Sequence, residues 1–436
     1  MNVEVLGGDS AVNGLVWVRG AREEYDAFAD LGNPGWNWDR FYSAMRKAEN
    51  LEMPSQELTD EFGFVVEPGS LGSAGPVNVS FPAFLPLQHQ KLINASIELG
   101  HDFNSDAYNG TNKGVFYSLS SERRSSVRVS AEFAYADPVI ARENLVILYN
   151  GALATSLNIT GTGIIRASGV YVRFPDNTVQ YATVESAGEV ILSAGTIRTP
   201  QLLELSGIGD KNILDPLKID VKVDLPGVGA NYVDHTITIL TYLLKEPYES
   251  FDALSYDLAL RAEQEKLYEE GEGWLTFSNA VVNMSPIDNI LSSEEIAIAN
   301  QILEIKPPTL QEDLFESIKG MIFKVPQAEY LLFNSFSGGP AKETNRSYVS
   351  MAITHLHPLS RGSIHINSSS IDDFPLINPN VLESDWDEWF LAKATAYGRR
   401  FSQTESFQEI FEKEVFPTAA NVSSHAQWEA KLSNAE

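Results

Sequence analysis

The sequence contains no cysteine, which excludes disulfide bonds, thiolate metal ligands and a cysteine nucleophile. It also lacks any uninterrupted apolar run approaching about eighteen residues, so we expect no membrane-spanning helix. Positive charge is scarce, because 31 lysines and arginines stand against 59 aspartates and glutamates, for a net charge of -28. Nucleic acid and anionic membranes would both repel such a surface, so we expect neither as a partner.

What is present is a chain of 436 residues, 43% of them hydrophobic and 21% charged. This composition is typical of a soluble globular protein, and the length favours two or more domains. The first part of the chain alternates loops with amphipathic helices, and strand patterns begin at Asn144.

Acceptor motifs for N-glycosylation, N-x-[ST], are more frequent than chance predicts. With 27 asparagines in the chain, chance would give roughly four such motifs. Two interpretations are open: an Asn- and Ser-rich composition, or a protein with a secretory history. Met1–Glu4 carries no signal-peptide pattern, so an N-terminally truncated secretory protein would reconcile the observations. The eight acceptors are Asn78, Asn94, Asn109, Asn158, Asn283, Asn345, Asn367 and Asn421.

Hydrophobic periodicity predicts the main secondary-structure elements. A Thr199-Pro200 start signal predicts a further helix, which Gly207 ends. We expect the region 144–209 to form one unit, in which the strand Glu189–Ser193 leads into the helix at Thr199. The other predicted helices are Trp38–Leu51, Leu85–Leu99, Arg128–Ile140 (disturbed by Pro138), Ser285–Ile305, Asp385–Phe401 and Ser424–Leu432. The predicted strands are Leu145–Leu148, Val170–Phe174, Val179–Val184, Glu189–Ser193, Val349–Leu356 and Ser363–Ile366.

A glycine-rich stretch lies close to the start of the chain, at LGGDSAVNGLVWVRG (6–20). Glycines allow a backbone to approach a ligand closely, and successive N–H groups in such a loop bind phosphate oxygens. Asn13 adds amide groups that suit the polar edge of a ring. By itself the Gly7-Gly8 pair is a weak signal, and a structural turn explains it as well.

Two histidines, His355 and His357, invite interpretation as a catalytic or metal-binding pair. Their spacing of two on a strand permits shared ligation, but no third ligand stands at the required spacing. We therefore predict a structural role for both, and a fold-anchoring role for His235. No metal site is predicted.

Several separated blocks, taken in order, resemble the glucose-methanol-choline (GMC) oxidoreductase family. The resemblance runs over essentially the whole chain, although 236–350 matches no motif, and fungal aryl-alcohol and glucose oxidase-like members are most similar. The blocks are LGGDSAVNGLVWVRGAREEYD (6–26), LGNPGWNWD (31–39), SAGTIRTPQLLELSGIG (193–209), LPGVGANYVDH (225–235) and HLHPLSRGSIHIN (355–367).

The resemblance implies an α+β fold, with an FAD-binding domain of Rossmann type and a substrate domain on an antiparallel sheet. We place the N-terminal, FAD-binding part at 1–235, lacking its first βαβ unit. A substrate-domain insert follows at 236–349, and the C-terminal part occupies 350–436.

The resemblance also assigns cofactor-binding positions. Ser10, Asn13, Gly14 and Val16 match places where members contact the FAD pyrophosphate or the flavin ring, and Ala154 matches the adenine contact. Asp9 departs from the family, which usually has Ser, Thr or Gly there. A carboxylate beside the pyrophosphate would be repelled by a few kcal/mol unless it pointed away.

The implied activity is FAD-dependent oxidation of a small-molecule alcohol by hydride transfer to the flavin. The family's dinucleotide-binding turn would precede residue 6, and its catalytic pair would follow Glu436. We therefore assign no catalytic residue, and expect this chain alone to bind FAD weakly and oxidise no alcohol. The alternatives are a flavin-dependent lyase or cyclase of the same family, or a non-catalytic remnant. The expected location is secreted for the parent protein, and cytoplasmic if Met1 is the genuine start.

Overall fold

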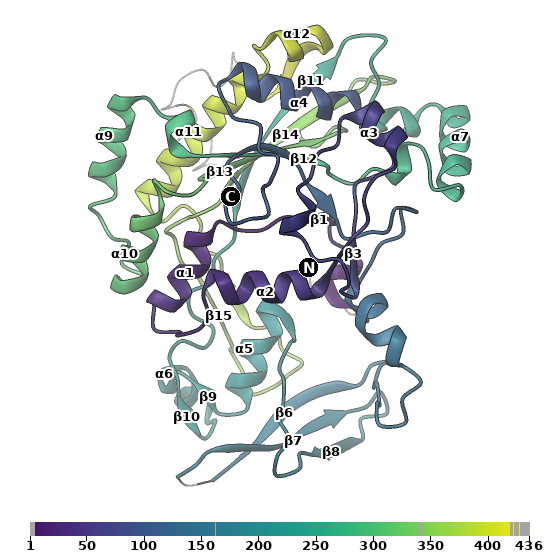
Figure 1. Cartoon of the computed structure of the whole chain (residues 1–436). Helices are drawn as coiled ribbons and strands as arrows, with labels where there is room; N and C mark the ends of the chain where they lie inside the picture. Colours follow the sequence, from purple (N-terminus) through teal and green to yellow (C-terminus); the bar gives the residue numbers. More distant parts are fainter. Residues whose placement is uncertain (1–4, 162, 340–341, 419–421, 423–426, 428–436) are drawn as a thin grey trace.

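The computed structural model describes residues 5–161, 163–339, 342–418, 422 and 427. It has an α+β fold, as the sequence predicted, in which a large antiparallel sheet and a small one occupy different parts of the molecule (Figure 1). No helix in these described ranges is long and apolar enough to cross a membrane. The predicted helix Ser424–Leu432 lies outside the described residues.

The larger sheet has six strands in the order β17-β11-β14-β13-β12-β4, with every neighbouring pair antiparallel. It therefore joins strands from distant parts of the sequence, including β14, which the alternating apolar pattern predicted to within one residue at each end. The strands are β4 (Gly114–Tyr117), β11 (Thr236–Leu244), β12 (Val281–Ser285), β13 (Ala328–Phe333), β14 (Tyr348–His355) and β17 (Phe411–Phe416).

One face of this sheet is covered by helices α4 (Leu87–Glu98), α11 (Asp385–Phe401) and α12 (Glu405–Ile410), which lie at the top and upper left of Figure 1. The prediction for α11 is confirmed at both ends. Its first turn carries three acidic residues and its last turn carries Arg399 and Arg400, which complement the helix dipole. Alternate residues of β14 on this face, Val349, Met351 and Ile353, are fully buried in the main core.

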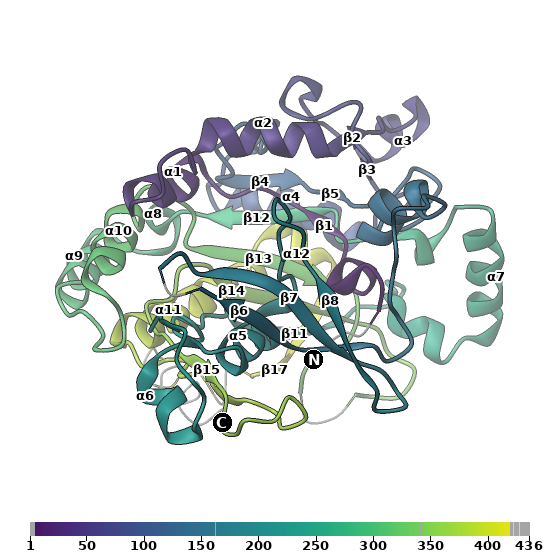
Figure 2. The same ribbon diagram turned by 90° about the horizontal axis from the view of Figure 1, so that it is seen from below.

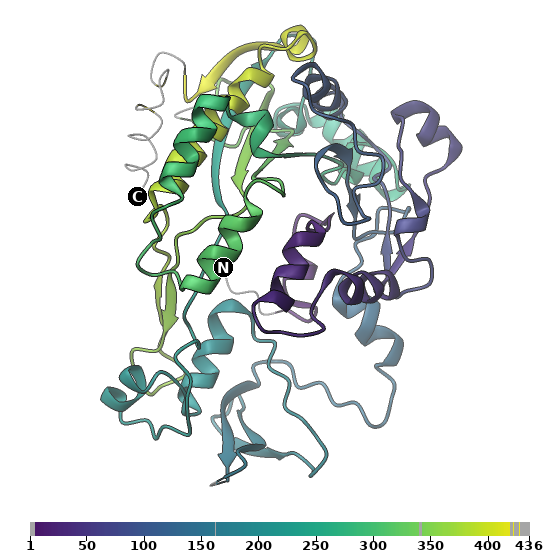
Figure 3. The same cartoon turned by 60° about the vertical axis from the view of Figure 1, so that its left-hand side comes forward.

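The smaller sheet consists of β6, β7 and β8 and lies at the opposite end of the molecule from α12 (Figure 3). The predicted hairpin is confirmed, since β7 and β8 pair around the turn at Asp176 and Asn177. Helix α5 packs against β6. The bounds are β6 (Leu153–Thr160), β7 (Arg166–Arg173), β8 (Val179–Thr183) and α5 (Gly195–Leu205).

The remaining elements are short or peripheral; α7, for example, lies at the edge of the molecule in Figures 1 and 2. The helices are α1 (Arg22–Asp30), α2 (Trp38–Ala48), α3 (Gln56–Phe62), α6 (Lys211–Leu214), α7 (Leu258–Glu269), α8 (Ile287–Ile290), α9 (Ser293–Ile302) and α10 (Glu312–Met321). The strands are β1 (Val16–Trp17), β2 (Glu49–Leu51), β3 (Val77–Val79), β5 (Leu119–Ser120), β9 (Ile208–Gly209), β10 (Val223–Asp224), β15 (Ser363–His365) and β16 (Leu376–Asn378).

Two predicted strands are wrong. The segments Leu145–Leu148 and Glu189–Ser193 are not paired as strands. Their central apolar side chains face solvent, with Val146 77% exposed and Ile191 82% exposed. Apolar β-branched residues favour an extended chain, but a strand also needs a neighbour to accept and donate its backbone hydrogen bonds.

Three predicted helices need correction. Helix α5 begins at Gly195, four residues before the predicted N-cap Thr199. Thr199 lies within the first turns of the helix, where its hydroxyl accepts a hydrogen bond from the N–H of the N-cap residue Ala194 at 3.1 Å. The predicted helix Arg128–Ile140 is only a π-helical turn (Glu132–Ala136) followed by a 3-10 turn at Pro138. The predicted helix Ser285–Ile305 is split into α8 and α9, with a new capping box at Ser292.

Candidate functional site

The glycine-rich stretch forms a tight loop that leads into β1. Gly7 and Gly8 have φ values of +90° and +56°, a left-handed conformation that glycine adopts without a steric penalty. A short 3-10 helix, Gly8–Ala11, follows. The Ser10 hydroxyl donates to the Gly7 carbonyl at 2.5 Å and accepts from the Ala131 N–H at 2.8 Å. The hydroxyl predicted to meet a pyrophosphate is therefore already engaged within the protein.

Arg128 holds the next turn of this loop. Its guanidinium donates to Asn13 Oδ1 at 2.8 Å and to the Ser10 carbonyl at 3.2 Å. Asn13 Oδ1 also accepts from the Leu15 N–H, and Leu15 has a φ of +67°, which is strained for a residue with a branched side chain. Asn13 and Gly14 remain exposed, so the edge of the loop that the sequence assigned to the flavin is open.

The predicted cofactor residues fall into two groups. Ser10, Asn13, Gly14 and Val16 lie together in the loop and at the start of β1. Ala154 lies in β6 of the smaller sheet, and β6 lies well below the start of the chain in Figure 1. Asp9 is exposed at the first turn of the short helix, and its carbonyl accepts from the Val12 and Asn13 N–H groups.

The second face of the six-stranded sheet carries a row of apolar side chains. The pairing register places them side by side on successive strands, and Val18, which follows β1, packs against the buried cluster that contains Phe116 and Val282. The loop assigned to the flavin therefore leads, through β1, to this row of apolar side chains, which is termed the apolar wall. The apolar row consists of Phe116, Val282, Leu331, Ala352 and Ile239.

A single carboxyl group, that of Glu329, lies in the neighbouring row of the same face. Its cross-strand neighbours are Met284 and Thr354. Burial raises the pKa of the Glu329 carboxyl, while its hydrogen bond with Thr354 lowers it; the net direction is upward. A carboxyl in an apolar wall with a raised pKa can hold or exchange a proton with a polar group of a ligand.

Sequence reasoning missed Glu329. The available signal was weak: one acidic residue in the alternating strand segment Ala-Glu-Tyr-Leu-Leu-Phe, at 328–333. An acid in a half-buried strand normally faces solvent. Only the register with β12 and β14 places it beside apolar neighbours.

The three histidines lie near one another but have different surroundings. His355 is fully buried against Trp386 and Phe390 of α11, and burial lowers its pKa well below the ordinary value. His357 Nε2 lies 2.9 Å from Glu24 Oε1, so it ties the end of β14 to α1. His235 and His357 line a cavity of about 360 Å³, and burial lowers the His235 pKa.

These contacts support the structural roles that the sequence predicted for His355 and His357. In the described ranges, no group of three or more His, Cys, Asp or Glu side chains is arranged to hold a metal ion.

Comparison with known proteins gives concordant matches. A family model described as GMC oxidoreductase matches residues 2–237. The GMC oxidoreductase family protein Mala s 12 of Malassezia sympodialis is 32% identical, over 98% of this chain and 68% of that protein. A dehydrogenase of Armillaria gallica is 29% identical, over 98% of this chain and 69% of its own length.

Solved structures agree. An FAD-dependent oxidoreductase from Chaetomium thermophilum superposes with a TM-score of 0.88 at 26% identity, covering 99% of this chain and 74% of that one. A fungal aryl-alcohol oxidase has the same fold, with a TM-score of 0.84 at 24% identity, covering 98% and 74%.

Proposed function

Because the chain belongs to the GMC oxidoreductase family, whose cofactor is FAD, we propose that the protein oxidises a small-molecule alcohol. When bound, FAD supplies the acceptor for the hydride that leaves the alcohol carbon. The observation that carries the proposal is the apolar wall of the second sheet face, with Glu329 as the one carboxyl in its adjoining row. An apolar wall with one polar group is typical of a site for a small, weakly polar substrate.

The residues at the loop fit a flat ring system. A Cβ atom added at Gly8 or at Gly14 would meet no other atom within 4 Å, so open space lies beside both. Asn13 and Gly14 would lie along the flavin edge, with Val16 behind them. The Ser10 hydroxyl keeps its internal bonds and shapes the loop, so backbone groups are left to bind the pyrophosphate.

Glu329 would orient the alcohol. Its carboxylate accepts a hydrogen bond from the substrate hydroxyl, while Leu331 and Ile239, the partly exposed members of the apolar row, exclude water from the reacting carbon. Because burial raises its pKa, the carboxyl exchanges a proton closer to neutral pH than an exposed glutamate does. The smaller sheet and Ala154 would then lie on the nucleotide side of the cofactor.

Flavin titration tests the cofactor part of this proposal. Gly14→Val would fill the open space with a side chain without disturbing any packed neighbour. We expect it to weaken FAD binding at least tenfold while the unfolding transition is unchanged. Gly320→Ala, where a Cβ also meets no atom, is the matched control. Equal FAD affinity in the wild type and Gly14→Val would place the flavin elsewhere.

Asp9→Ser tests whether the carboxylate at position 9, where family members usually have Ser, Thr or Gly, weakens FAD binding. Removing a carboxylate near two phosphate charges should strengthen FAD binding about tenfold at low salt, and less at high salt. If the affinity does not change, the carboxylate points away from the pyrophosphate.

Anaerobic reduction tests the reaction. The assay uses residues 1–436 joined to the flanking segments of a GMC relative, because the resemblance places the dinucleotide-binding turn and the catalytic pair in those segments. A panel of aliphatic, benzylic and secondary alcohols is added to this flavin-loaded protein, and loss of the yellow flavin absorbance is followed. We expect Glu329→Gln to slow reduction about a hundredfold, and Glu343→Gln, an exposed acid, to leave it unchanged. A bound flavin that no alcohol reduces would refute alcohol oxidation, and a rearranged product without reduction would indicate a lyase.

We also propose that the protein is secreted and carries N-linked glycans on its exposed acceptors. Asn94, Asn109, Asn345 and Asn367 are exposed. Asn283 is fully buried, and its Nδ2 donates to Ser96 Oγ at 2.9 Å, so a glycan there is incompatible with folding. Mass spectrometry of protein secreted from yeast should find glycans at the exposed sites. A folded protein glycosylated at Asn283, or at none of the four, would contradict this.

A further inference from the structure

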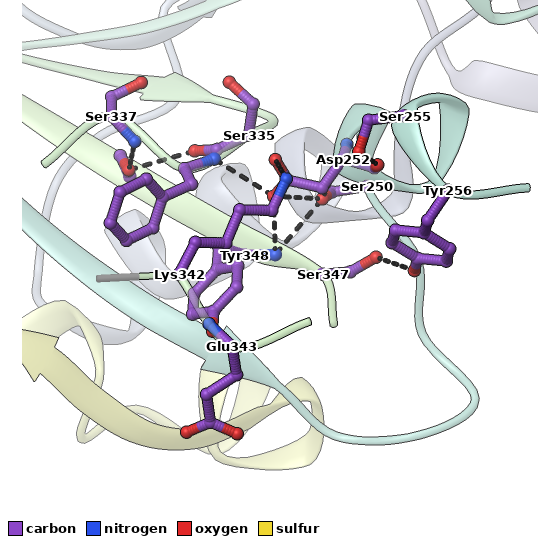
Figure 4. A network of polar contacts seen from close by, with 12 residues as sticks. Ser250, Asp252, Ser255, Tyr256, Ser335, Ser337, Lys342, Glu343, Ser347 and Tyr348 are labelled. Atoms are coloured by element: carbon purple, nitrogen blue, oxygen red, sulfur yellow. Dashed lines mark hydrogen bonds and ion pairs between the residues drawn. The ribbon is translucent and has the colours of Figure 1, made fainter. Parts of the chain in front are cut away.

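One buried carboxylate, that of Asp252, holds both ends of the connection between β13 and β14 (Figure 4). Asp252 Oδ2 accepts from the Phe336 N–H and the Tyr348 N–H, each at 3.0 Å. It also accepts from the Ser250 hydroxyl at 3.1 Å, and Oδ1 lies 2.7 Å from Lys342 Nζ. Because every one of these partners satisfies a buried charge, the carboxylate is fixed in place.

The part of this connection nearest β13, Ser335–Gly339, is termed the strap. Ser350 of β14 also holds it: its hydroxyl donates to the Ser335 carbonyl and accepts from the Ser337 N–H, both at 2.9 Å. Ser350 lies on the second face of the six-stranded sheet, opposite Phe333 of β13 and Thr241 of β11. The strap therefore crosses that face.

The strap borders the apolar row. A Cβ atom at Gly338 would lie 3.7 Å from Ile239, the last member of that row, and 3.5 Å from Phe416. The Phe336 ring packs edge-on against Tyr348 at 5.1 Å between centroids. The side chains of Asp252 and Ser350 both bond to the backbone of the strap, so its polar groups are already paired and it forms a rigid boundary.

We propose that Asp252 is a positioning residue that fixes the strap as the end wall of the substrate space and so limits the length of the alcohol. This inference rests on the proposed function, because it takes the second face as the substrate wall. Asp252 does not touch substrate in this arrangement; it acts through the Phe336 N–H and the Tyr348 N–H.

Asp252→Asn tests the anchor, since it keeps the shape but removes the charge and one acceptor. We expect amide hydrogen exchange at Phe336 and Tyr348 to accelerate about tenfold, as the loss of a charge-assisted hydrogen bond predicts. Lys342→Met is the matched control, because it removes the cation and leaves both backbone bonds intact. Unchanged exchange in Asp252→Asn would overturn the anchoring role.

Substrate length tests the wall. The affinities of a short and a long primary alcohol for the flavin-loaded protein are compared by ligand-observed NMR. We expect Asp252→Asn to shift the short-to-long preference about tenfold towards the long alcohol, whereas Glu343→Gln should leave the preference unchanged. If Asp252→Asn fails to fold, Ser350→Ala releases the strap from its other side and should give the same shift.

The outcomes separate the two proposals. If neither alcohol binds to the wild type, the proposed function fails. If both bind, and Asp252→Asn accelerates exchange without altering the length preference, alcohol oxidation stands and the wall assignment is wrong.

Discussion

The two sheets of this protein differ in how far they are covered by other elements and in how many of the nearby apolar segments pair with them as strands. The six-stranded sheet is covered by α4, α11 and α12, and β14 is buried along its whole length. In the smaller sheet every residue of β8 is exposed, and the apolar segments at 145–148 and 189–193 have no strand pairing. The sequence patterns of the two regions are equally strand-like. The difference teaches that a β pattern becomes a strand only where a neighbouring strand pairs with its backbone, since β8 is paired with β7 although it is fully exposed.

The largest expected effect lies in the helix-covered region. Phe390 of α11 is fully buried against His355 and Trp386. Phe390→Ala should destabilise the protein by about 3–5 kcal/mol, through lost burial and the cavity left behind. Urea denaturation followed by far-UV circular dichroism measures this. A loss below about 1 kcal/mol would mean that the helix layer contributes little to the sheet.

The next effect depends on pH and concerns Glu122, which lies beside β5. Burial raises the pKa of its carboxyl to about 7, although a hydrogen bond from Ser278 and the Arg128 charge both lower it. Because the folded protein holds this proton more tightly than the unfolded chain does, the raised pKa contributes stability that is fully present at a pH below the pKa of the unfolded state. This contribution is lost as the pH rises through about 7. Each step of one in pKa is worth about 1.4 kcal/mol, so the loss is about 3 kcal/mol.

Glu122→Gln isolates this contribution, because glutamine stays neutral. The difference in unfolding free energy between wild type and variant should change by about 3 kcal/mol between pH 4.5 and pH 8, in favour of the variant at high pH. Parallel pH profiles for the two proteins would show that Glu122 titrates normally.

A smaller effect is expected at the junction of β6 and α5 in the less covered region. The Ser206 hydroxyl accepts from the Leu157 N–H at 2.8 Å and donates to the Leu202 carbonyl at 2.6 Å. Ser206→Ala leaves the Leu157 N–H unpaired and should cost about 1–2 kcal/mol. Faster hydrogen exchange confined to β6 and β7 would accompany it. If Ser206→Ala lowered the unfolding free energy as much as Phe390→Ala does, the two sheets would not differ in how strongly their surroundings stabilise them.

The smallest effect on stability is expected at the exposed apolar segments. Val146→Ser and Ile191→Ser remove side chains that are mostly in solvent, so the unfolding free energy should change by no more than about 0.5 kcal/mol. The same pair should reduce binding of a hydrophobic dye and slow aggregation. A clear loss of stability would mean that a further layer covers both segments in solution.

The sequence by itself determined the elements whose signals are local. Terminal charges predicted α11, and the strand patterns predicted β14 and the β7–β8 hairpin, because those interactions lie within a few residues of chain. The family blocks also identified the glycine-rich loop. Only the tertiary structure decided which apolar runs became strands and which acid faced an apolar wall. Glu329, Asp252 and the strap owe their positions to cross-strand registers and contacts between distant segments, and no local pattern specifies which segments meet.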